Sequence, residues 1–289
     1  MSPFMMGNSR ATLLLTAFSF LLVSCISGVR LNSSHGNILP QTVVGDAAAL
    51  RGSMIEHDNG KSRVQGYFIA PRTHLSHGSA VLLHDKNGLS ERIKQTADDL
   101  AAEGYSIFAI DLFDEANLKK SKTPSTPLDK TLPKKNEVFL KINQAIEYLR
   151  ARRQSNGKIA LIGWSLGGTI ALDYALNVQN NDGTAVFFAD LPDNLDAFYR
   201  MRHELYGTFA ESPELQKRKI FKQVAYIQRA IGSYSDLYIY EDVDPEFWLY
   251  VDKNTSRNRL AAEDAWLRLK GYLLRTINSE GGLYEQKKY

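Results

Sequence analysis

The chain has 289 residues, of which 44% are hydrophobic and 23% are charged, with 35 basic against 32 acidic residues. This near balance argues against nucleic acid as the main partner, because binding to phosphates needs a concentrated basic surface. The chain is long enough for one large domain. Its single cysteine, Cys25, excludes a disulfide within the chain.

Residues 1–24 have the pattern of a secretory signal peptide. Their one charge, Arg10, precedes a short apolar run that falls below the ~20 residues of a membrane-spanning helix. The run ends in "LVSC", which resembles a bacterial lipobox in which Cys25 is lipidated and becomes the new N-terminus. A plain signal peptide with a chance cysteine is the alternative, but lipidation explains a lone cysteine in an exported chain. We therefore expect a lipid anchor on a membrane of the bacterial cell envelope, with the domain outside the cytoplasm.

Polar, unpatterned residues 25–41 predict a tether after the cysteine. No internal repeat and no polar linker divides the rest of the chain. We therefore expect one domain over residues 42–278 and a C-terminal tail at residues 279–289.

Short apolar runs alternate with helical patterns along this domain. Residues 49–71 predict a hairpin with Asn59-Gly60 in its bend. The later elements are, in chain order, a strand at 78–85, a helix after Ser90 that stops at Gly104, a strand at 106–113, a helix at 136–153, a strand at 158–164, a helix from 165, a strand at 184–190, a helical piece, a strand at 205–211, a helix at 213–231, a strand at 236–242 and a helix at 261–277. This alternation predicts an α/β fold, a mostly parallel sheet with helices on both faces. The carboxyl ends of parallel strands meet at one edge of the sheet, where sites form.

One serine lies at such a strand end, in the stretch "KIALIGWSLGGTIALDYAL" (residues 158–176). Gly163 and Gly167 flank Ser165 in a Gly-x-Ser-x-Gly frame, which permits the tight strand-to-helix turn that exposes a nucleophile. The helix predicted behind this serine points its first amides at the site and can hold an oxyanion. A glycine-rich turn with an incidental serine is the alternative.

With these residues the chain resembles the dienelactone hydrolase family of α/β-hydrolases, from about Ala49 to Ile277. The matching stretches are "GYFIAP", "AVLLHDKNGLSERIKQTADDLAAEGYSIFAIDLF", "GKIALIGWSLGG", "YGTFAE" and "AAEDAWLRLKGYLLRTI". The resemblance implies an α/β-hydrolase fold and a small ester or lactone ligand, with no cofactor. No cluster of His, Asp and Glu in the sequence has metal-ligand spacing, so we expect no metal. It gives Ser165 the place of the nucleophile, where most members have cysteine. Asp85 takes the family's carboxylate position beside His84, and the oxyanion amides come from Asp85 or Lys86 together with Leu166.

The rest of the family's triad is missing. The family has an aspartate in a Phe-Gly-Glu-x-Asp-Pro pattern, where this chain reads "FAESP", one residue short and without the aspartate. The family's histidine lies in a Gly-His-Gly-Phe pattern, where "YEDVDPEFW" places Pro245. No histidine follows His203. A serine hydroxyl without a base is a poor nucleophile at neutral pH.

Two residues remain as candidates for the base. His84 is the one histidine that we expect at the same edge of the sheet as Ser165. In related hydrolases, however, a histidine at this position is usually a structural residue that hydrogen-bonds the loop. Asp85 lies beside it, but a carboxylate is a weak base for a hydroxyl unless its pKa is raised. Phe247, Trp248 and Tyr250 replace the histidine loop, and we expect core packing for them rather than a cap over the pocket or a binding surface.

The sequence therefore predicts a membrane-anchored, dienelactone-hydrolase-like protein that is weak or silent as an ester or lactone hydrolase. Loss of triad members costs several orders of magnitude in rate. Two alternatives stay open. One is an active hydrolase that uses His84 or Asp85 as an unconventional base. The other is a lipoprotein that binds a ligand or a partner in the old cleft.

Overall fold

The computed structural model describes residues 49–60, 62–113, 134–211, 216–249 and 256–278. All of them belong to the compact unit Asn37–Tyr289. The expected signal peptide, the lipidated Cys25, the tether, the C-terminal tail and Tyr250 lie outside the described residues. Within these ranges, no helix combines the length and the apolarity that crossing a membrane requires.

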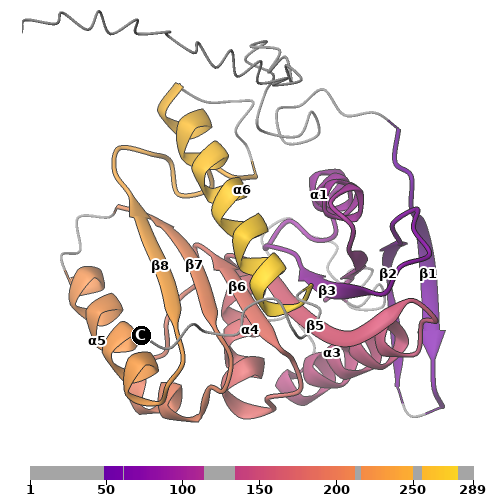
Figure 1. The fold of residues 1–289 in the computed structure, drawn as a ribbon, viewed down its shortest axis with the longest axis horizontal. Helices are drawn as coiled ribbons and strands as arrows, with labels where there is room; N and C mark the ends of the chain where they lie inside the picture. The colour runs from indigo at the N-terminus through magenta and orange to yellow at the C-terminus, as the bar shows by residue number, and fades with distance from the viewer. Residues whose placement is uncertain (1–48, 61, 114–133, 212–215, 250–255, 279–289) are drawn as a thin grey trace, which may run out of the picture. The chain divides into compact units, whose positions relative to one another are not determined.

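The described strands form one eight-stranded, mostly parallel sheet (Figure 1). The α/β-hydrolase architecture expected from the alternating pattern is confirmed. In spatial order the strands are β1 (Ser53–Asp58), β2 (Arg63–Ile69), β4 (Ser106–Ile110), β3 (His77–Leu83), β5 (Ser155–Trp164), β6 (Gly183–Phe187), β7 (Leu205–Ala210) and β8 (Ser235–Tyr240). Strand β2 pairs antiparallel with β1 and β4, and all later pairs are parallel.

The first two strands form the expected hairpin. Ser53 pairs with Phe68 and Asp58 with Arg63. Gly60 in the bend has φ 81°, a left-handed conformation that glycine adopts without steric cost. The Asn-Gly signal in the sequence is thereby confirmed.

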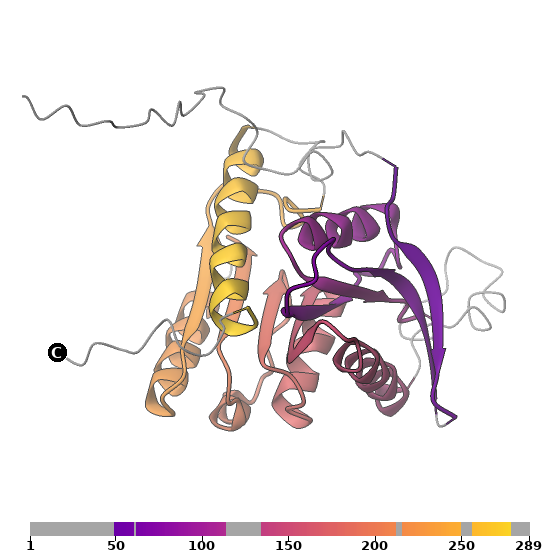
Figure 2. The ribbon, with the colours of Figure 1, turned by 45° about the vertical axis from the view of Figure 1, so that its right-hand side comes forward.

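Helices cover both faces of the sheet (Figures 1 and 2). One face packs against α1 (Glu91–Ala102) and α6 (Ser256–Thr276). The other packs against α3 (Lys135–Arg150), α4 (Leu166–Asn177), the 3₁₀ helix η2 (Leu195–Arg200) and α5 (Gln216–Ala230). Ser90 caps the N-terminus of α1, where its side chain accepts a hydrogen bond from the Ile93 amide.

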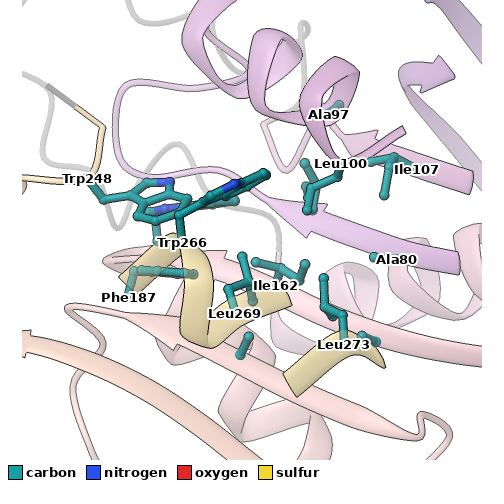
Figure 3. Close-up of a cluster of buried hydrophobic side chains, with 14 of the residues drawn as sticks. Ala80, Ala97, Leu100, Ile107, Ile162, Phe187, Trp248, Trp266, Leu269 and Leu273 are labelled. Carbon is teal, nitrogen blue, oxygen red and sulfur yellow. The ribbon is translucent and has the colours of Figure 1, made fainter. Parts of the chain in front are cut away.

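Successive side chains of each central strand point to opposite faces of the sheet, as the period of two residues in a strand requires. In β3, Ala80 and Leu82 pack toward α1 and α6, whereas Val81 and Leu83 pack toward α3. Figure 3 shows the first cluster, in which side chains of α1, such as Leu100, and of α6, such as Leu269, pack on the same face of the central strands. The strands are therefore buried on both faces, and their carboxyl ends meet at one edge of the sheet.

Candidate active site

Ser165 lies at that edge, between β5 and α4. Its backbone has φ 49° and ψ −114°, a conformation that costs a non-glycine residue about 1–3 kcal/mol. Two hydrogen bonds hold the turn: the Ser165 amide donates to the Phe187 carbonyl over 2.7 Å, and the Thr169 amide donates to the Ser165 carbonyl over 3.0 Å. The strained turn expected from the Gly-x-Ser-x-Gly frame is confirmed.

The two glycines of the frame are required by close backbone contacts. A Cβ on Gly163 would lie 2.3 Å from the Gly167 carbonyl oxygen. A Cβ on Gly167 would lie 2.1 Å from the Leu83 carbonyl oxygen, at the end of the neighbouring strand β3. The helix therefore approaches the sheet so closely that only glycine fits at either position.

The first amides of α4 lie directly behind the serine. Leu166 and Gly167 open the helix, so their N–H groups have no acceptor within it. Together with the positive end of the helix dipole they suit a developing oxyanion. The second amide expected there, that of Lys86, belongs to the loop after β3. Leu83 pairs with Gly163, so this loop starts beside the elbow.

His84 is fully buried, and both of its ring nitrogens are engaged. Nδ1 lies 2.7 Å from the Asp85 carbonyl oxygen, to which it donates, and Nε2 accepts from the Leu112 amide over 2.9 Å. Nε2 also lies 3.4 Å from Asp111 Oδ1, and the ring packs on Phe113 with centroids 4.8 Å apart. The neutral ring thus joins the ends of β3 and β4. Both ring nitrogens already have backbone partners, which favours the structural role of His84 over the role of base for Ser165.

Asp85 is also buried, and it organises the same loop. Its Oδ1 accepts from the Asn87 amide over 3.0 Å, and its Oδ2 accepts from Asn87 Nδ2 over 2.7 Å. Asn87 belongs to no sequence motif, but an aspartate commonly accepts from the backbone amide two residues later in an Asx-turn. Asp85 follows β3, and Asp190 follows β6, on the two sides of the elbow strand β5.

The segment that replaces the family's histidine loop turns inward. Phe247 and Trp248 are buried, as expected for core packing. Trp248 packs on Phe187 with centroids 4.9 Å apart, and Phe247 packs on Phe188 at 5.3 Å. Pro245, at the position of the missing histidine, is exposed on this turn.

The family's acid position is not filled either. Glu211 follows β7, is exposed, and donates its amide to the Tyr240 carbonyl over 2.7 Å. Residues 212–215, where the aspartate would fall, lie outside the described ranges. The aspartate of the family's triad therefore has no counterpart among the described residues after β7.

The other described histidines are too far from Ser165. His203 precedes Thr208 by five residues, and Thr208 is level with Phe187 at the elbow, so His203 lies ~16 Å away along the strand direction. His77 precedes Leu83 by six residues, which is ~20 Å at the same rise. His74 comes before His77, and His57 lies on β1, four strand spacings or ~19 Å from β5.

His203 and His77 have structural partners at the opposite edge. His203 Nε2 lies 2.8 Å from Thr184 Oγ1, and burial lowers the pKa of His203 to about 4. His77 Nε2 lies 2.8 Å from Ser106 Oγ. Within the described residues, no hydrogen bond joins the Ser165 hydroxyl to another side chain, and no group of three His, Cys, Asp or Glu residues is placed to hold a metal.

Two curated relatives carry the same enzyme name. A Saccharolobus solfataricus protein assigned as a carboxymethylenebutenolidase is 26% identical over 260 residues, which cover 76% of this chain and 97% of that protein. Carboxymethylenebutenolidase 1 of Cupriavidus pinatubonensis is 28% identical over 123 residues, which cover 38% of this chain and 50% of that protein.

Solved structures share the fold. A Klebsiella pneumoniae protein assigned as a dienelactone hydrolase has a TM-score of 0.66 at 17% identity, over 79% of this chain and 100% of that one. Dienelactone hydrolase from Anabaena variabilis has a TM-score of 0.60 at 13% identity, over 79% of this chain and 99% of that one. The sequence profile of the dienelactone hydrolase family matches residues 64–277. This chain therefore belongs to the dienelactone hydrolase family.

Proposed function

We propose that this chain is a lipid-anchored member of the dienelactone hydrolase family whose Ser165 site has lost base catalysis. Such a site binds small esters or lactones of carboxylic acids and turns them over weakly or not at all. The hydrolase class follows from the family and from the retained elbow. The loss of activity and the anchor are the parts that need experiment.

One observation carries the proposal: no described histidine can take the proton of Ser165. The only one at the right edge, His84, uses Nδ1 and Nε2 for backbone partners. A positioned base is worth ~10²–10⁴ in rate, and the serine hydroxyl depends on it for nucleophilicity. What remains is the oxyanion site at α4, which supplies only residual catalysis.

The test is a comparison of single variants on p-nitrophenyl acetate and a simple lactone. We expect slow turnover by the parent, a further loss in Ser165→Ala, and no specific loss in His84→Ala per mole of folded protein. Turnover typical of the family in the parent would overturn the proposal. Equal rates for the parent and Ser165→Ala would assign the residual rate to background and leave the cleft as a binding site.

A second candidate is an active hydrolase in which Asp85 takes the proton. The observation that favours it is the position of Asp85, buried in the loop that starts beside the elbow. Asp85→Asn keeps the size and the polar character of the side chain but removes its charge. If Asp85→Asn lowers turnover as far as Ser165→Ala while the fold is kept, this second function holds.

The cellular location follows from the N-terminal sequence. Cys25 after the apolar run would carry the lipid, residues 25–41 would span from the membrane to the domain, and the domain would lie outside the cytoplasm. Two or more acyl chains at the N-terminus can hold a protein on a bilayer without a spanning helix.

A further inference from the structure

The outer face of α6 carries a line of exposed leucines. Leu260, Leu267 and Leu274 are 65%, 48% and 54% exposed, and they are spaced by seven residues. Seven residues are almost two full turns, so the three side chains lie along one stripe of the helix. Single exposed leucines need no explanation, but three of them at two-turn intervals give one side of this 21-residue helix an apolar line, with Glu263, Asp264 and Lys270 between the leucines.

The opposite face of α6 packs on the sheet and holds the helix in place. Ala262, Ala265, Trp266, Leu269 and Leu273 are buried against the sheet (Figure 3). The packing of α6 on the sheet therefore does not involve the outer leucines. Their apolar area has no partner among the described residues of the same molecule.

Gly271 lies on the same stripe, one turn after Leu267. Among the described residues a Cβ there would meet only Arg275 Nη1, at 3.7 Å, so none of their contacts requires glycine. Glycine inside a helix costs about 0.5–1 kcal/mol relative to alanine. A small residue on an outer helix face lets a second helix approach closely. Gly271 is thus a second observation, independent of the leucines, that points to a helical partner.

The charges beside the leucines show which partner fits. Glu263 and Asp264 precede Leu267 by four and three residues, and Lys270 follows it by three. If a second copy of α6 packs antiparallel with Leu267 on the twofold axis, position 264 of one copy is level with Lys270 of the other, but Asp264 lies on the other edge of the stripe, where it accepts from Tyr240 and pairs with Arg268. Glu263 is then offset from the same lysine by one residue, ~1.5 Å along the axis. In that arrangement Leu260 also faces Leu274 of the second copy.

We propose that the outer face of α6 is an isologous interface between two copies of this chain, with the two helices antiparallel about Leu267. Such pairing buries all three leucines and joins acidic to basic side chains at both ends, as twofold symmetry requires. The current partners of these charges are exposed side chains: Glu263 pairs with Arg259 over 3.3 Å and Lys270 with Glu103 over 3.2 Å. Both can add a partner across the interface. A single helix pair is a small interface, so the dimer is of micromolar affinity.

Sedimentation velocity of the purified full chain at ~1–100 μM tests the proposal in the range expected for a small interface. We expect a monomer–dimer equilibrium for the parent and a dissociation constant raised ~10-fold or more by Leu267→Glu. Leu140→Glu is the matched control: Leu140 on α3 is 48% exposed, like Leu267, but lies outside the stripe. It should leave the equilibrium unchanged. A parent that stays monomeric, or a dimer that Leu267→Glu does not weaken, overturns the proposal.

Charge reversal tests the antiparallel register. Glu263→Lys and Lys270→Glu should each weaken the dimer, and the double variant should recover the affinity of the parent. If the double variant is as weak as the sum of the single effects, the register is wrong.

Cross-linking keeps the proposal testable if Leu267→Glu does not fold. In a Cys25→Ser background, which removes the only native cysteine, Leu267→Cys should form a disulfide dimer, and Leu140→Cys should not. Equal cross-linking of both contradicts the interface.

Vesicles of phosphatidylcholine and phosphatidylglycerol test whether a membrane surface, instead of a second copy, covers the leucines. Leu267-dependent binding of a monomeric chain to them would mean that the stripe faces a membrane, and would also overturn the dimer.

Discussion

Replacing His84 by alanine separates a structural role from a catalytic one. The substitution removes the acceptor of the Leu112 amide and the donor to the Asp85 carbonyl, and both of these backbone groups are in the buried junction of β3 and β4. A buried backbone group without a partner costs about 1–3 kcal/mol, so the two together predict a loss of about 2–6 kcal/mol in the free energy of unfolding. This is a large part of the stability of a typical domain, about 5–15 kcal/mol.

Urea unfolding followed by tryptophan fluorescence measures this loss, and activity per mole of folded protein is measured beside it. His84→Gln is the matched variant: its amide oxygen can reach the place of Nε2 and accept from Leu112, so it should lose clearly less stability than alanine. Residual turnover per folded molecule should be the same in the parent and in both variants. If His84→Ala is as stable as the parent but loses the Ser165-dependent turnover, the structural role is refuted and the histidine is the base.

Three further predictions follow from single positions. Burial, and next to it the charge of Asp98, raises the pKa of Asp99 to about 7. The folded chain therefore holds a proton that the unfolded chain loses near pH 4, and stability falls as pH rises from about 4 to 7, by up to ~1.4 kcal/mol per pH unit. Asp99→Asn should remove this slope in urea unfolding series across that range; an unchanged slope contradicts it. Gly167→Ala should lose about 3–5 kcal/mol or fail to fold, because its Cβ would meet the Leu83 carbonyl oxygen, and near-parent stability would contradict the elbow geometry. Cys25→Ser should release the protein from the membrane fraction or leave it unprocessed; unchanged retention and processing would exclude the anchor.

The fold could be predicted because its signals are local. Buried strands such as residues 106–110 are continuous apolar runs, and the Asn59-Gly60 bend and the Ser90 cap each depend on a few neighbouring residues. The elbow belongs to the same class, since the spacing of Gly163 and Gly167 directly reflects how closely the helix approaches the strand end. The strand predicted to reach Phe113 stops earlier, at Ile110, because Asp111 and the residues after it leave the sheet to meet His84 and its loop.

The family resemblance favours a structural role for His84, but its partner on β4 could not be predicted, because that partner is distant in the sequence. The Leu112 amide comes 28 residues later and is brought to the ring only by the parallel pairing of β3 and β4. The sequence therefore left a base and a structural residue as alternatives. The inward turn of Phe247 and Trp248 was favoured by their size and hydrophobicity, but the aromatic partners Phe187 and Phe188 come from another strand end and become neighbours only in the fold.

The central claim is that Ser165 has kept its elbow but has no base. Labelling of Ser165 by a fluorophosphonate probe, followed by mass spectrometry between pH 6 and 9 with Ser165→Ala as the blank, tests it most directly. We expect slow labelling without an inflection near the histidine pKa of ~6.5. Fast labelling with such an inflection, lost in a folded His84→Ala variant, would contradict it.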